Sequence, residues 1–64
     1  MSVKHYIGRA QAAAGEASIR LQELTDKKES VTEAEVEEAQ AWLEEAIEEC
    51  ATAIAQLERD EEES

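Results

Sequence analysis

The sequence predicts an all-α fold: an antiparallel two-helix hairpin with Ala-rich close packing, assembling into a dimeric four-helix bundle or a higher symmetric oligomer. Apolar residues recur at alternating steps of four and three along both halves of the 64-residue chain, as they do along a coiled-coil seam. A short polar segment separates the halves. A chain of this length seldom gains more than about 3–5 kcal/mol from its own core, so a partner is expected.

Composition alone permits a rival interpretation, intrinsic disorder. Leu, Ile, Val and Phe together make up 11 of the 64 residues, and the net charge is −11. An aliphatic fraction below about 20% with high net charge is typical of disordered chains. Two separate segments with regular apolar spacing favour the folded hairpin, because composition ignores the order of residues.

The first helix is predicted at about 3–27, with Ser2 as its N-cap. Its seam residues are Val3, Ile7, Ala10, Ala14, Ala17, Leu21 and Leu24. Gly8 and Gly15 lie beside this seam, and each costs about 1 kcal/mol relative to Ala in a helix interior. They are either weak points that the helix tolerates or places where another backbone approaches closely.

The second helix is predicted at about 32–60, after a turn at about 28–31 and before a frayed acidic tail at 61–64. Its start is marked by a capping box, in which Thr32 and Glu35 have the Thr-x-x-Glu spacing. In such a box the Thr hydroxyl accepts from the backbone N–H of the Glu, and the Glu carboxylate accepts from the backbone N–H of the Thr.

Val31 and Val36 stand at the two ends of a hydrophobic staple across this start. The second seam consists of Val36, Gln40, Leu43, Ile47, Cys50, Ile54 and Leu57. Folding the chain about residue 30 pairs small residues of the first helix with large ones of the second. The predicted pairs are Leu24 with Val36, Leu21 with Gln40, Ala17 with Leu43, Ala14 with Ile47, Ala10 with Cys50, Ile7 with Ile54, and Val3 with Leu57.

Catalytic chemistry is not expected, and neither is a cofactor or a metal. His5 is the sole histidine and Cys50 the sole cysteine, so no nucleophile–base set or zinc pattern can be assembled. Cys50 is expected to be a small core residue. No apolar run reaches the roughly 18 residues of a membrane span, and no signal peptide is recognised. The expected location is the cytoplasm, or the host cytoplasm if the protein is viral.

Three large side chains fall outside both seams, Tyr6, Ile19 and Trp42. Exposed groups of this kind on a small chain indicate association. We therefore expect them in an oligomer interface. The alternative for Trp42 is that it lies over the hairpin as a partial lid.

Charge is distributed unequally between the two halves. Residues 1–31 carry five basic and four acidic groups, net +1, whereas residues 32–64 carry thirteen acidic groups and one Arg, net −12. A ridge of glutamates is predicted along the outer face of the second helix. It consists of Glu37, Glu38, Glu44, Glu45, Glu48 and Glu49. Three interpretations stay open: a solvated face, a docking surface for a basic partner, which includes a mimic of DNA that occupies a basic groove, and an adaptation to high salt.

Binding of DNA or RNA is unlikely, because phosphate contacts need Lys or Arg. The candidates for nucleotide or nucleic-acid contact are Lys4, Arg9, Arg20 and Arg59. Three of the four lie on the first helix, and the surrounding acidity of the second helix repels an anionic backbone.

The chain resembles the Rop family of small RNA-binding regulators of plasmid copy number. The likeness lies in chain length, the hairpin with Ala and Leu layers, a Cys late in the second helix, and the acidic tail Asp60-Glu61-Glu62-Glu63. It implies a dimeric four-helix bundle in which the first helix binds RNA.

The second helix also resembles that of phage proteins that sequester the cyclic oligonucleotide signals of bacterial immunity. The matching residues are Glu38, Ala39, Trp42, Leu43, Ala46, Ala53, Leu57 and Arg59. They cover about a third of the chain, and Glu48-Glu49-Cys50 departs from the family pattern. The resemblance implies a homo-oligomer with nucleotide sites between protomers.

The sequence therefore predicts a non-enzymatic interaction or regulatory protein, with a phage-encoded inhibitor among the candidates, that self-associates and binds another macromolecule, such as a basic host protein. A protein that sequesters a cyclic oligonucleotide is the second hypothesis. A minor virion or assembly component is the third.

Overall fold

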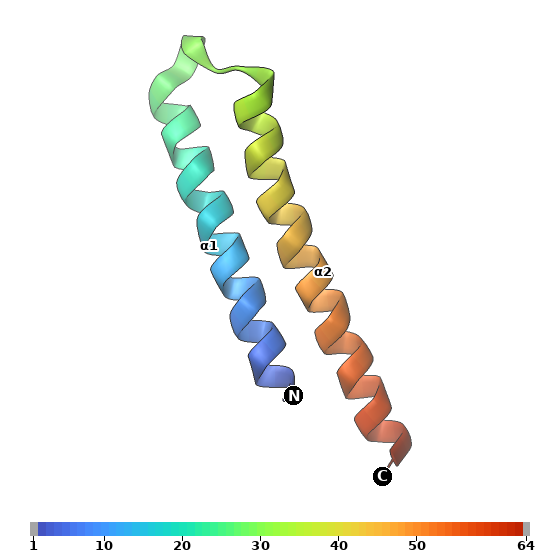
Figure 1. Cartoon of the computed structure of the whole chain (residues 1–64). Coiled ribbons are helices and arrows are strands. Elements are labelled where there is room, and N and C mark those ends of the chain that lie inside the picture. The colour runs from blue at the N-terminus through green and yellow to red at the C-terminus, as the bar shows by residue number, and fades with distance from the viewer. Residues whose placement is uncertain (1, 64) are drawn as a thin grey trace.

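Two long helices packed against each other make up the chain (Figure 1). The computed structural model describes residues 2–63, apart from the side chains of residues 28 and 61–63. The two ends of the chain lie at one end of the hairpin and the turn lies at the other. The Cα atoms extend over 54 × 16 × 12 Å. The all-helical hairpin predicted from the sequence is confirmed.

Helix α1 spans Val3–Lys27 and is followed by a single 3₁₀ turn, η1, at Lys28–Ser30. At its start the N–H of His5 donates to the carbonyl of Ser2 over 3.0 Å. At its end the carbonyl of Lys27 accepts from the Ser30 hydroxyl at 3.5 Å. The helix ends three residues after Leu24, the last residue of the predicted seam.

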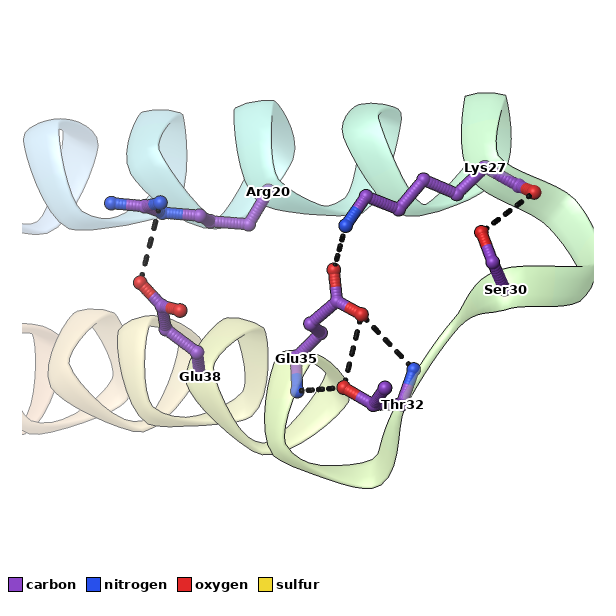
Figure 2. Close-up of polar contacts among 6 residues, drawn as sticks. All are labelled: Arg20, Lys27, Ser30, Thr32, Glu35 and Glu38. Carbon is purple, nitrogen blue, oxygen red and sulfur yellow. Dashed lines mark hydrogen bonds and ion pairs between the residues drawn. The ribbon is translucent and has the colours of Figure 1, made fainter.

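Helix α2 spans Glu33–Glu63 and begins with the predicted capping box (Figure 2). The N–H of Thr32 donates to Glu35 Oε1 at 3.1 Å, and the N–H of Glu35 donates to Thr32 Oγ1 at 3.3 Å. Both reciprocal bonds of the motif are present. The helix continues through Glu63, so its predicted end near residue 60 is too early. Residue 64 of the predicted tail lies outside the described residues.

Small side chains form the contact between α1 and α2. The buried residues are Ala10, Ala13, Ala17, Ala39 and Ala53. Among the described residues no large side chain is fully buried. Alanine lets helix axes approach toward the low end of the usual 8–10 Å range. The predicted Ala-rich packing is present, but the hairpin encloses very little apolar volume.

The rows that face each other differ from the predicted seams, which is the main correction to the sequence analysis. On α2 every residue of the observed row stands one position before its predicted counterpart. The observed row is Glu35, Ala39, Trp42, Ala46, Glu49, Ala53 and Gln56, all buried or half-buried. The whole predicted row is exposed, including Cys50, which is not a core residue. One position is a rotation of about 100° around the helix axis.

On α1 the same one-position change replaces Ile7, Ala14 and Leu21 in the seam. The residues that take their places are Tyr6, Ala13 and Arg20. Val3, Ala10, Ala17 and Leu24 belong to both the predicted and the observed rows, since the two 3–4 patterns overlap. The physical reason lies on α2, where the observed row contains three alanines and the predicted row none, so the observed row lets the two backbones approach more closely. The bulkier rows are left on one side.

Candidate interaction surfaces

One broad side of the hairpin carries most of its exposed large aliphatic side chains. Eight large apolar residues are 43–67% exposed among the described residues. Seven of them are spaced by seven or fourteen residues along three rows, so they lie on one side. We call this side the apolar face: Ile7 and Leu21 on α1, with Val36, Leu43, Ile47, Ile54 and Leu57 on α2. Such an area is typical of an interaction site.

The apolar face is hollowed near the open end of the hairpin. A groove of about 490 Å³ is lined there by residues of both helices. Its rims include Ile7, Ile54 and Leu57, and small residues such as Ala10 and Ala53 also line it. Val3 and Leu57, a predicted pair, both line this groove, as do Ile7 and Ile54. The axial register of the hairpin therefore agrees with the prediction, although the rotation of the helices does not.

The total surface of the hairpin is large for its mass. A folded monomer of 7.1 kDa exposes about 4,100 Å² by the usual scaling with mass. The hairpin exposes 4959 Å², which is about 900 Å² more than that scaling gives. A typical stable interface removes about 800 Å² from each partner. The excess surface is thus about what one association event would bury.

The opposite side carries the ion pairs between the helices, and we call it the charged face. Arg9 Nε lies 3.2 Å from Glu49 Oε2, and Arg20 Nη1 lies 3.2 Å from Glu38 Oε1. Lys27 Nζ pairs with Glu35 Oε2 beside the turn (Figure 2). In each pair the cation comes from α1 and the carboxylate from α2. The unequal charge of the two halves is therefore partly used to hold them together.

The Lys27–Glu35 pair shifts the titration of both groups. A hydrogen bond from Lys27, helped by bonds from Thr32, lowers the pKa of Glu35 below 4.5. The hydrogen bond and charge of Glu35 raise the pKa of Lys27 above 10.5. Since Glu35 also closes the capping box, this one carboxylate joins the helix start to the other helix.

The six glutamates of the predicted acidic ridge do not form one solvated surface. Glu38 and Glu49 pair with α1, and Glu45 is half-buried beside Arg9 and Trp42. Only half of the set is exposed without an ion pair. These residues are Glu37, Glu44 and Glu48, which we call the outer glutamates. A docking role for the predicted ridge is thereby narrowed to these three positions.

None of the three predicted interface residues is among the seven residues of the apolar face. Tyr6 and Trp42 are half-buried against the hairpin. Trp42 shares a shallow pocket on the charged face with Ala13 and Glu16, which agrees with its alternative role as a partial lid. Ile19 is 56% exposed and lies away from the apolar face. The apolar face was not predicted from the sequence, because the aliphatic rows that form it were expected inside the hairpin.

The predicted basic residues are also divided. Arg9 and Arg20 are engaged by glutamates of α2, and Arg20 lies 4.0 Å from Glu16 as well. Lys4 and Arg59 are exposed. Neutralised guanidinium groups attract phosphate less, so the structure assembles no basic patch from these four residues.

Among the side chains that the structure describes, no group of three or more His, Cys, Asp or Glu is placed to hold a metal ion. His5 stacks edge-on against Tyr6, with ring centroids 5.4 Å apart. No helix in the described part of the chain is long and apolar enough to cross a membrane. The chain matches no protein-family model, and no curated protein or solved structure matches it. Both resemblances noted in the sequence remain hypotheses.

Proposed function

We propose that this chain is a non-enzymatic cytoplasmic interaction protein that self-associates through its apolar face and binds a macromolecular partner with its remaining surface. One observation carries the proposal. Seven large aliphatic side chains lie exposed on one side, while the contact between the helices buries only alanines completely. Fully burying one such side chain contributes about 1.5–3 kcal/mol, so covering this face is the main source of stability available to the protein.

Stacking two hairpins through their apolar faces gives a four-helix bundle. The surface that remains outside carries the ion pairs and the outer glutamates, Glu37, Glu44 and Glu48. A basic protein would be attracted to this surface, and salt would screen the attraction. Sequestration of a cyclic oligonucleotide gains no support from Arg9 and Arg20, because glutamates already occupy them.

Self-association is tested by analytical ultracentrifugation between about 1 and 100 µM. We expect a dimer or a larger symmetric species that stays helical by circular dichroism. A folded monomer of 7.1 kDa throughout this range would overturn the proposal, because the apolar face would then be stable in water.

The partner is sought by capture from a host lysate at low and at high salt. The matched baits are the wild type and a variant in which Glu37, Glu44 and Glu48 are replaced by Gln. This variant keeps the ion pairs of Glu38 and Glu49. Retention of one basic protein by the wild type alone supports the outer glutamates as the docking surface. Equal retention by both baits rejects it, and co-purified nucleotide would favour the sequestration hypothesis.

A further inference from the structure

The apolar face fits a second copy of the chain in one of two possible arrangements. Given the proposed self-association, on which this inference rests, a two-fold axis can lie along the helices or across them. An axis along the helices puts both turns at the same end and packs α1 of each copy on α2 of the other. An axis across the helices puts the turns at opposite ends and packs α1 on α1 and α2 on α2.

Side-chain size distinguishes the outer edges of the apolar face. On α2 this edge carries Ile47 and Ile54, which are 67% and 56% exposed. On α1 the equivalent positions are occupied by smaller polar residues, Gln11 and Ser18, and Gly8 and Gly15 lie beside them on the same edge. A Cβ added at either glycine would meet nothing within 4 Å. The hairpin itself therefore does not require glycine there, although each Gly costs about 1 kcal/mol relative to Ala.

Axial position strengthens the match. Because Ile7 and Ile54 line the same groove, Ile54 stands at the level of residues 6–7 of α1, and Ile47 stands two turns closer to the turn of the hairpin. When both turns lie at the same end, these levels are kept between the copies. The partner's Ile54 then falls between Lys4 and Gly8, and the partner's Ile47 falls between Gln11 and Gly15. Large side chains meet small ones, which fills space without voids.

Charge favours the same arrangement. The outer edge of α2 carries Glu37, Glu44 and Glu58, whereas Lys4 is the charged residue at the corresponding edge of α1. With both turns at the same end, Lys4 lies at the level of the partner's Glu58. With the turns at opposite ends, the two acidic edges would run side by side, and like charges across an interface are costly.

We propose that two copies stack through their apolar faces with both turns at the same end, so that α1 of each copy packs on α2 of the other. The bulky outer edge of α2 is seated on the glycine edge of α1. The acidic outer edge of α2 is kept apart from the same edge of α2 in the second copy. The apolar face, the two otherwise unexplained glycines and the unequal charge of the helices receive a single explanation.

The arrangement is tested by a distance between two turns. A spin label is placed at Glu29→Cys, an exposed turn position, in a Cys50→Ala background that leaves one cysteine per chain. Turns at the same end give a distance of about 10–30 Å, because packed layers lie about 10 Å apart. Turns at opposite ends give about 40 Å or more. The label at residue 29 lies about 21 Å along the helix from residue 15, the middle of α1, and the distances in the two copies add.

Sedimentation of the same labelled sample separates the two possible failures. A dimer with the short distance supports the arrangement. A dimer with the long distance overturns the arrangement and leaves the proposed self-association standing. A folded monomer overturns both and points to a different occupant of the apolar face.

A charge swap provides a second test that needs no label. At low salt, Lys4→Glu alone should weaken dimerisation a few-fold, because it faces the partner's Glu58. Adding Glu58→Lys should restore the dimer affinity, because the pair is then reversed rather than broken. If the two changes act independently on the dimer Kd, these residues do not face each other and the arrangement is wrong.

Discussion

The two broad sides of the hairpin are built from the same two helices but are completed to different degrees. On the charged face the helices supply opposite charges, and Arg9, Arg20 and Lys27 each find a carboxylate of α2. On the apolar face the large side chains remain 43–67% exposed. On the charged face the two helices satisfy each other's charges within one chain, whereas on the apolar face the large side chains stay uncovered.

The difference shows where stability and specificity come from. Exposed ion pairs contribute about 0–1 kcal/mol each, so three of them align the helices without stabilising the fold strongly. Burial of an aliphatic side chain contributes about 1.5–3 kcal/mol. The charged face therefore sets which residues meet within the hairpin, and the apolar face supplies most of the remaining free energy only when it is covered.

The largest expected effect compares two isoleucines of similar exposure on different sides. Ile47→Lys places a charge on the apolar face and should cost at least about 2 kcal/mol per copy. Ile19→Lys, away from that face, should change stability by no more than about 0.5 kcal/mol. Sedimentation and thermal unfolding measure both. Equal behaviour of the two variants would mean that the apolar face is not buried in solution.

How far the sequence predicts this structure depends on the kind of signal. The capping box is local, so Thr32 and Glu35 predicted the start of α2 directly. The turn position then set the axial register. The rotation of the helices could not be predicted, because two overlapping 3–4 rows run along α1 and both carry apolar residues. In α2 the row that contains Ala39 and Ala53 lies outside the predicted seam, yet it forms the contact.

The candidate site was predicted less well for a related reason. Rotating α2 by one residue moves Glu49 from the outer surface to the contact with Arg9. It also moves Leu43 from the seam to the exposed face. A periodic pattern shows that a helix has an apolar side, but it does not show whether that side faces the same chain or another one.

The second prediction tests the contact within the hairpin. Ala17 is 0% exposed, so Ala17→Leu should overpack the seam and cost about 1–3 kcal/mol. Ala51→Leu, an exposed position on α2, is the matched control and should stay within about 0.5 kcal/mol. The expected loss of stability in Ala17→Leu corresponds to a thermal midpoint several degrees below that of the Ala51→Leu control. Identical midpoints would contradict the burial of Ala17 between the two helices.

The third prediction compares two glutamates of the predicted ridge and expects opposite signs. The Glu49 side chain is 13% exposed and pairs with Arg9, so Glu49→Gln should destabilise the protein by up to about 1 kcal/mol. Glu44 is exposed and stands four residues before Glu48. Glu44→Gln should therefore stabilise it by a few tenths of a kcal/mol.

Urea unfolding at about 0.01 M and 0.15 M salt measures these two changes. Both should shrink at the higher salt, where the Debye length falls to about 8 Å. If both variants shift stability in the same direction at low salt, the division of the ridge into paired and outer glutamates is wrong.

The smallest expected effect is the pH dependence of the Lys27–Glu35 pair. Since the folded-state pKa of Glu35 lies below 4.5, its contribution to stability is present above the unfolded pKa and is lost as pH falls through the folded pKa. The folded-state pKa of Lys27 lies above 10.5, so its contribution is complete below that value and is lost as pH rises through the folded pKa. Stability should therefore fall slightly in acid and in strong base.

Replacing Lys27 by Met isolates the pair from the capping box. The main cause of the lowered pKa of Glu35 is removed, while the bonds from Thr32 remain. NMR titration of the Glu35 carboxyl should show a pKa that rises but stays below its ordinary value, because the hydroxyl and N–H of Thr32 still favour the carboxylate. The exposed Lys4→Met change is the matched control and should leave the Glu35 titration in place. A Glu35 titration unaffected by Lys27→Met would mean that the ion pair does not form, and that the capping box alone holds this carboxylate on the charged face.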